Sequence, residues 1–103
     1  MKNENLLRNI ISHYGAAKQT DMAIEEMSEL TKALLKWRRT ADIENISDLY
    51  LSSLHSDIAE EIADVQIMLD QLTLIYNVED AVNEWISKKI KRTLDRMKEE
   101  NRE

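Results

Sequence analysis

Cysteine and proline are absent from this 103-residue sequence, and glycine occurs once, at Gly15. The lack of cysteine excludes disulfides, thiolate metal sites and a cysteine nucleophile, and it fits a reducing compartment. With no proline and one glycine, few residues interrupt helices, and the β-branched residues do not alternate with polar ones as they do in strands. The composition therefore predicts an all-α fold in a single domain that spans residues 1–103.

Long apolar runs are also missing. No segment approaches the roughly 20 apolar residues of a membrane span. The first residues, "MKNENLLRN", lack the apolar core of a signal peptide. We therefore expect a cytoplasmic protein with no membrane partner.

Positive charge is scarce over most of the chain. Residues 1–87 contain 7 Lys or Arg against 16 Asp or Glu, whereas residues 88–103 contain 7 against 4, so the net charge of −6 divides into −9 and +3. An acidic body repels nucleic acid over most of its surface. We therefore expect no nucleic-acid partner.

Apolar residues at three- and four-residue spacing predict four helices. The first covers residues 4–14 and is followed by Gly15, where a C-terminal cap belongs. The second covers residues 18–39, and its last turn is basic, which suits the negative end of a helix dipole.

The third predicted helix is unusually long and has Ser47 as its N-cap. A break near Ser56, with Asp57 as a new cap, is the alternative. The fourth helix has Asn77 as its N-cap, and its charged tail is expected to fray from about residue 98.

Two apolar lines run along the third helix on nearly opposite sides. A homodimer is our preferred explanation, because four short helices offer little to cover both. We therefore expect a four-helix, bundle-like fold with long antiparallel second and third helices, completed by formation of a dimer or tetramer. The second line consists of Leu49, Ala63, Ile67 and Leu74.

Paired carboxylates recur on the second and third helices. Glu26 and Glu29 lie roughly 60 to 120 degrees to one side of the apolar stripe of their helix. Glu61 and Asp64 take the same offset, in the same rotational sense, on the third helix. Equal offsets converge when two facing helices are antiparallel, which is the default for consecutive helices with a short connection. The four carboxylates should therefore line one edge of the helix pair.

Such a cluster predicts a metal site. Four carboxylates at the border of a core repel one another and lose hydration, so they would raise their pKa values or splay the helices without a cation. Oxygen ligands favour magnesium or manganese over zinc. A di-iron carboxylate bundle is less suitable, because it uses Glu-x-x-His and no glutamate here has a histidine three residues later. The ordinary alternative is a solvated acidic face.

The segments "AIEEMSEL" and "IAEEIADVQIMLDQL" resemble the MazG-like all-α nucleoside triphosphate pyrophosphohydrolases, most closely the short single-domain forms of bacteria and phages. Their signature is Glu-x-x-Glu followed by Glu-x-x-Asp on the next long helix. The resemblance implies that Mg²⁺, or Mn²⁺, is bound by Glu26, Glu29, Glu61 and Asp64. It also implies cleavage of a nucleoside triphosphate to the monophosphate and pyrophosphate, a reaction often used to clear unwanted nucleotides.

Within this interpretation the catalytic residues are Glu29 and Glu61. A carboxylate not wholly engaged with metal can orient or deprotonate the attacking water, and Glu29 is the residue we assign to that step. His13 and His55 each stand alone in the sequence, and neither is a convincing general base.

Four further residues are candidate substrate ligands. Gln19 and Lys89 fall where similar short sequences have these residue types. Arg92 shares one flank of the fourth helix with Lys89, and both can neutralise phosphate charge. Trp37 can stack on a base, and a role in the core is its alternative. The basic tail beyond these residues is otherwise expected to be solvated.

Two other classes of function remain open from the sequence. One is a catalytically inactive helical dimer that binds nucleotides or a protein partner, suggested by the second apolar line of the third helix. The other is a purely structural coiled assembly.

Overall fold

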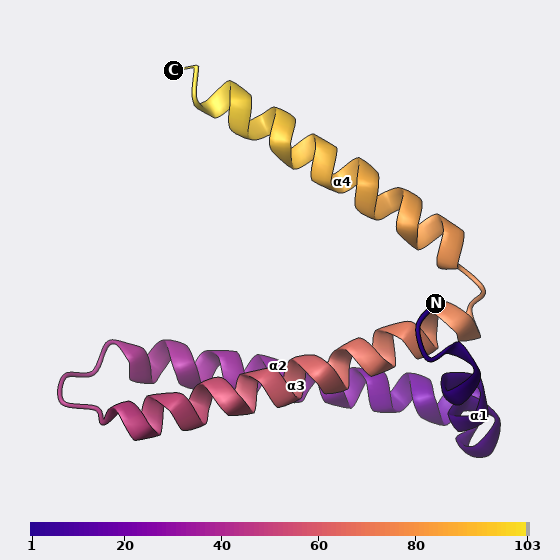
Figure 1. Cartoon of the computed structure of the whole chain (residues 1–103), viewed down its shortest axis with the longest axis horizontal. Helices are drawn as coiled ribbons and strands as arrows, with labels where there is room; N and C mark the ends of the chain where they lie inside the picture. Colours follow the sequence, from indigo (N-terminus) through magenta and orange to yellow (C-terminus); the bar gives the residue numbers. More distant parts are fainter. Residues whose placement is uncertain (103) are drawn as a thin grey trace.

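A computed structural model describes residues 1–102 and contains four helices, α1 (Glu4–Tyr14), α2 (Ala16–Ala41), α3 (Asp48–Ile75) and α4 (Glu79–Glu100). Residues 1–102 include no strand, so the all-α prediction is confirmed. The long helices α2 and α3 form a hairpin, α1 packs against its open end, and α4 leads away from the end of α3 (Figure 1). No helix in the described part of the chain combines the length and apolar character needed to cross a bilayer.

Local sequence signals place several helix ends where expected. Gly15 adopts a left-handed φ of 94°, which glycine tolerates, and its N–H donates to the Ile11 carbonyl at 2.7 Å, closing α1. Ser47 is the N-cap of α3, because its Oγ accepts a hydrogen bond from the Tyr50 N–H at 3.1 Å. Helix α3 then continues without interruption to Ile75, so the alternative break near Ser56 is wrong.

The start of α4 differs from the prediction. Asn77 has a left-handed φ of 52° and donates its N–H to the Leu74 carbonyl at 3.2 Å, so it closes α3 instead of capping α4. Asparagine tolerates this backbone region better than other non-glycine residues. Val78 occupies the N-cap position of α4. The helix ends at Glu100, and fraying of the tail from about residue 98 stays a prediction.

The α2–α3 hairpin contains most of the core. The Gln19 side-chain amide donates to Gln71 Oε1 at 2.8 Å at one end, and the rings of Trp37 and His55 lie 4.3 Å apart at the other. These two contacts show that the helices run antiparallel, as predicted. The buried apolar side chains are Leu7, Ala23, Leu54, Val65, Met68 and Leu74.

Helix α4 lies outside this core. Among the described residues, α3 is the only helix it contacts, and none of Glu79–Glu100 is buried. The radius of gyration is 18.0 Å, compared with about 13 Å for a compact domain of this length. Helices α1 to α3 therefore pack together, and α4 does not complete a bundle with them in the single chain.

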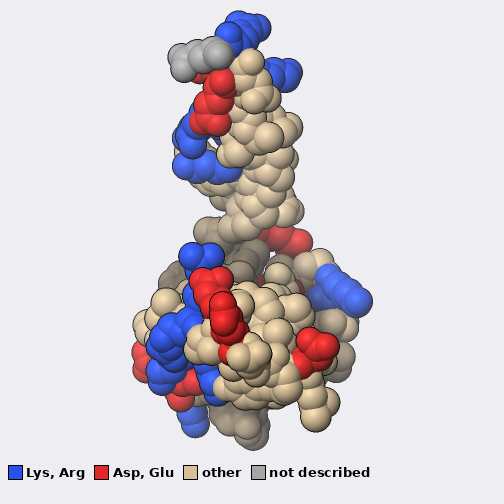
Figure 2. Space-filling view, turned by 90° about the vertical axis from the view of Figure 1, so that its left-hand side faces the viewer, with Lys and Arg blue, Asp and Glu red and all other residues tan. Residues whose placement is uncertain are grey.

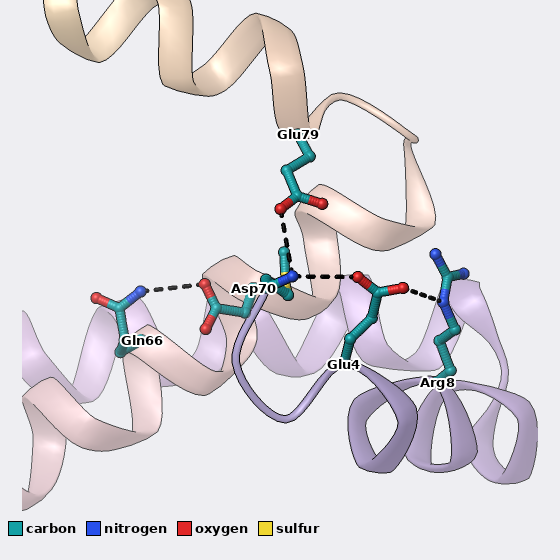
Figure 3. A network of polar contacts seen from close by, with 6 residues as sticks. Glu4, Arg8, Gln66, Asp70 and Glu79 are labelled. Carbon is teal, nitrogen blue, oxygen red and sulfur yellow. Dashed lines mark hydrogen bonds and ion pairs between the residues drawn. The ribbon is translucent and has the colours of Figure 1, made fainter.

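A polar network joins the first residue to α1 and α4. The Met1 ammonium group lies 3.3 Å from a carboxylate oxygen of Glu4 and 3.5 Å from one of Glu79, and Arg8 Nε donates to the other Glu4 oxygen at 3.1 Å. Figure 3 shows Glu4 and Glu79 converging from the two helices. The hydrogen bond to Glu4 raises the pKa of the Met1 amino group. The network helps to set the direction in which α4 leaves the hairpin.

We predict that Gln71→Leu lowers the free energy of unfolding by about 1–3 kcal/mol, because it leaves the buried Gln19 amide without a partner. The double variant Gln19→Leu/Gln71→Leu should recover much of this loss, since it removes both polar groups. Urea unfolding followed by circular dichroism measures both values. The exposed Ser52→Ala is the control, expected within about 0.5 kcal/mol of the parent. Equal stability of Gln71→Leu and the parent would contradict the prediction.

Candidate metal centre

Three carboxylates meet across the α2–α3 interface. Glu26 of α2 and Glu61 and Asp64 of α3 each offer an oxygen, and these oxygens all lie within 4.8 Å of one another. The helix register explains their meeting. Glu26 lies seven residues, or about two turns, after Gln19, and Asp64 lies seven residues before Gln71. Because Gln19 and Gln71 are hydrogen-bonded, Glu26 and Asp64 come to the same level of the hairpin.

The three side chains are half-buried, at the edge of the core. One oxygen of Glu61, Oε2, is buried and has no hydrogen-bond partner in the described part of the chain. No Lys or Arg within residues 1–102 forms an ion pair with Glu26, Glu61 or Asp64. A buried polar atom without a partner is costly. The cluster is therefore a site of concentrated negative charge that a proton or a cation would stabilise.

The electrostatics follow from this packing. Loss of hydration raises the pKa of Glu26, and the charge of Asp64 raises it further. Loss of hydration also raises the pKa of Glu61, followed by the effects of Asp64 and Glu29. Both glutamates therefore hold protons more tightly than free glutamate does. The set of three oxygens also fits a hard divalent cation such as Mg²⁺ or Mn²⁺.

Glu29, the fourth predicted ligand, lies outside this group. Its carboxylate accepts a hydrogen bond from Lys32 Nζ at 3.3 Å on the exposed side of α2. It is still close enough for its charge to raise the pKa of Glu61. An exposed ion pair one turn apart is weak, so the bond to Lys32 is a small barrier to any reorientation. The assignments of Glu29 as ligand and base stay predictions.

Two predicted substrate ligands lie within the hairpin and away from the cluster. Gln19 is only 6% exposed, and its amide is engaged by Gln71. Trp37 is half-buried and stacks against His55 near the α2–α3 connection, about 16 Å along α2 from Glu26. These positions suit structural roles, which was the alternative for Trp37. Contact of either residue with substrate stays a prediction.

Lys89 and Arg92 lie on α4, with their side chains exposed. Lys89 Nζ is 5.8 Å from the ring centre of Trp85 on the same helix. Because α4 leads away from the hairpin (Figure 1), the single chain does not bring these cations to the carboxylates of α2 and α3. Their role as phosphate ligands also stays a prediction.

Sequence reasoning missed Gln71, which holds the register of the cluster. Gln71 is 1% exposed and accepts the hydrogen bond from Gln19. Its spacing carries a signal, because Asp64, Met68 and Gln71 follow one another at four- and three-residue steps on one face of α3. A glutamine on a buried helical face requires a polar partner, and Gln19 provides it.

Compared with known proteins, the chain matches no family model, no curated protein sequence and no solved structure. The resemblance to MazG-like enzymes therefore rests on the two acidic motifs.

We predict that Glu61→Gln is more stable than the parent at pH 7 in the presence of a chelator. Because folding raises the pKa values of Glu26 and Glu61 above 4.5, the folded state binds more protons than the unfolded state just above that pH. The free energy of unfolding therefore falls as pH rises through the raised pKa values. Urea unfolding at pH 5 and pH 7 should show a smaller decrease for Glu61→Gln.

The control for this experiment is Glu44→Gln in the exposed α2–α3 connection, whose pH dependence should match that of the parent. A Glu61→Gln variant that is less stable than the parent at pH 7 without metal would contradict the charge repulsion inferred here.

We also predict that Mn²⁺ binds one site per chain and raises the thermal midpoint, because a dication neutralises the cluster and binds the folded state alone. Electron paramagnetic resonance of free Mn²⁺ measures the binding, and Mg²⁺ should compete. Glu26→Gln and Asp64→Asn should each lower the Mn²⁺ affinity by about 10-fold or more. Loss of an outer-shell partner already costs about 10- to 100-fold, and loss of a direct ligand should cost at least as much. Equal binding by Glu44→Gln and Asp64→Asn would contradict the assignment.

Proposed function

We propose that this protein is a magnesium-dependent nucleoside triphosphate pyrophosphohydrolase, which converts ribo- or deoxynucleoside triphosphates to monophosphates and pyrophosphate. The observation that supports it best is the meeting of Glu26, Glu61 and Asp64 across the hairpin, with one buried Glu61 oxygen left without a partner. These three residues belong to the two motifs that resemble the MazG-like family. Removal of surplus or non-standard nucleotides in the cytoplasm would be the cellular role.

The chemistry assigns different tasks to these side chains. Glu26, Glu61 and Asp64 would hold Mg²⁺, with Mn²⁺ as the alternative. When bound, the cation would neutralise phosphate charge and lower the pKa of a water molecule. Glu29 is outside the group of three. Only its Oε1 atom pairs with Lys32, in an exposed ion pair. It is therefore suited to orient or deprotonate the attacking water.

A second candidate function is a helical dimer that binds nucleotides or a protein partner without catalysis. It is favoured by α4, whose apolar side chains are uncovered and whose cations Lys89 and Arg92 lie away from the cluster in the single chain. This candidate predicts magnesium-dependent binding of nucleotides without release of pyrophosphate.

The test is a panel of ribo- and deoxynucleoside triphosphates incubated with the protein and Mg²⁺. We expect equal amounts of monophosphate and pyrophosphate, measured by chromatography and a pyrophosphate assay, and no products with a chelator. Asp64→Asn and Glu61→Gln should lower kcat/KM by about 100-fold or more, since even outer-shell partners of a metal are worth 10- to 100-fold. Circular dichroism should show unchanged helix content.

Glu44→Gln is the matched control and should keep the parent activity, because it removes a glutamate far from the cluster. No turnover across the panel by folded protein would overturn the proposal. Full activity of Asp64→Asn, or full activity with a chelator, would overturn the assignment of the ligands.

A further inference from the structure

Helix α4 carries an apolar stripe that the chain leaves uncovered. Five of its large side chains are each between 50% and 56% exposed. Four of them follow four- and three-residue steps and form one side of the helix, and Trp85 lies beside that side, about 100 degrees from Ile86. Figure 2 shows the projecting arm with an uncharged surface on one side and charged groups on the other. The five residues are Trp85, Ile86, Ile90, Leu94 and Met97.

The facing side of α3 is also uncovered. A pocket of about 590 Å³ lies where α3 and α4 diverge, lined by Leu69, Tyr76, Val82 and Ile86 among others. Farther along the same face of α3, Ile62 is 52% exposed. Helices α3 and α4 form the two arms of a V (Figure 1). Leu69 of α3 and Ile86 of α4 both line the pocket between them, so each inner face carries apolar side chains.

The size of the uncovered surface matches that of a dimer interface. The chain exposes 8225 Å², whereas a compact monomer of 12.1 kDa exposes about 6,000 Å². The excess is about 2,200 Å² per chain, or about 4,400 Å² for two chains, which is within the range of obligate homodimers. Helices in proteins also draw most of their stability from tertiary packing of an apolar face, which the single chain does not give to α4.

The connection between α3 and α4 holds α4 away from the α3 of its own chain. The turn between α3 and α4 is closed by hydrogen bonds from the Tyr76, Asn77 and Val78 N–H groups to carbonyls of the last α3 turn, at 3.0, 3.2 and 3.0 Å. The Met1 ammonium group pairs with Glu79 at 3.5 Å, and both residues line the pocket where α3 and α4 diverge. A short, well-bonded connection that prevents closure within one chain favours exchange of the same element between two copies.

The charges select the partner. Residues 1–87 carry a net charge of −9 and residues 88–103 a net charge of +3, so the part of α4 from residue 88 onward in one copy is attracted to the acidic body of another. A basic amphipathic helix can also bind anionic lipid, but the acidic body would be repelled from such a surface. A second copy of the chain is therefore the better match.

The lengths of the two arms also match. Glu61 and Asp64 precede Asn77 by 16 and 13 residues, and Lys89 and Arg92 follow Val78 by 11 and 14. At 1.5 Å per residue, both pairs lie about 16 to 24 Å from the turn. An α4 that packs along an α3 in the antiparallel direction therefore brings its two cations to the level of the two carboxylates.

We propose that two copies of this chain exchange their α4 helices, so that the apolar stripe of each α4 covers the uncovered face of α3 in the other copy. The exchange brings Lys89 and Arg92 of one copy to the acidic cluster of the other, where they bind the phosphates of the substrate. The interface stands on the apolar surface alone, whereas the phosphate role rests on the proposed function.

Sedimentation velocity of the full chain tests the interface. We expect a species of twice the 12.1 kDa chain mass, and a dimer dissociation constant raised at least about 100-fold in Ile90→Glu, which buries a charge in the interface. Ala81→Glu adds the same charge on the outer side of α4 and should leave the dimer intact. A monomeric parent chain, or equal dissociation constants for the two variants, would overturn the proposal. A monomer that co-sediments with phosphatidylserine vesicles would assign the stripe to a lipid surface instead.

Cross-linking tests the exchange itself, and it does not depend on the folding of Ile90→Glu. Because the chain has no cysteine, Thr93→Cys and Ile62→Cys chains with different tags can be mixed and oxidised. Both positions lie 15 residues from the turn, so the mixed disulfide should form. Thr93→Cys with Leu49→Cys, at the exposed far end of α3, should not. Equal yields in the two mixtures would overturn the exchange.

Mixing inactive chains tests the phosphate role. A Glu61→Gln/Asp64→Asn chain keeps both cations of α4 but lacks a functional acidic cluster. A Lys89→Ala/Arg92→Ala chain keeps the acidic cluster but lacks the two cations. In an equal mixture, half of the dimers contain both chains and each has one complete site, so we expect about a quarter of the parent activity. An active parent without recovery in the mixture would overturn the phosphate role. An inactive parent that still dimerises and cross-links would overturn the proposed function and leave the interface standing.

Discussion

The antiparallel packing of α2 against α3 determines the geometry of the candidate site. The Gln19–Gln71 hydrogen bond and the Trp37–His55 stack are at opposite ends of this interface. They leave one register in which Glu26 faces Asp64. A shift of one residue in that register would rotate a carboxylate out of the cluster and leave the buried glutamines without partners. The polar pair thus specifies alignment, which apolar contacts alone define less sharply.

The same packing produces the chemical problem that the cluster presents. Three carboxylates at the edge of a core lose hydration and repel one another, and the pKa values of Glu26 and Glu61 rise as a result. The described part of the chain supplies no cation to this group. A fold that keeps such a group tolerates an energetic cost in exchange for a strong, localised negative potential. This is the property that a dication and its phosphate ligand require.

Helix α4 shows the opposite arrangement. Its part from residue 88 onward belongs to the positively charged end of the chain, its apolar side chains are exposed, and its direction separates it from the acidic body. The excess negative charge lies on the body, and the excess positive charge lies at the far end of α4. Both the body and α4 leave apolar surface exposed. In the proposed exchange a second copy would resolve both at once, because each body would receive the α4 that the turn of the other chain holds away. In that arrangement the oligomeric state and the composition of the site have a common physical origin.

The sequence by itself determined the all-α class, since few residues interrupt helices and the apolar residues recur at three- and four-residue spacing without the alternation of strands. It also determined the closure of α1 at Gly15, the Ser47 cap of α3 and the placement of the acids at helical spacing, because these depend on neighbours within a few residues. Only the tertiary structure decided that Glu29 turns to Lys32, that Gln19 is buried against Gln71, and that α4 leaves the hairpin at Asn77. These features depend on side-chain rotamers, on one left-handed residue and on contacts between residues far apart in the chain. Helical periodicity places Gln71 on a buried face, but it does not identify the partner of Gln71, the rotamer of Glu29 or the direction of α4.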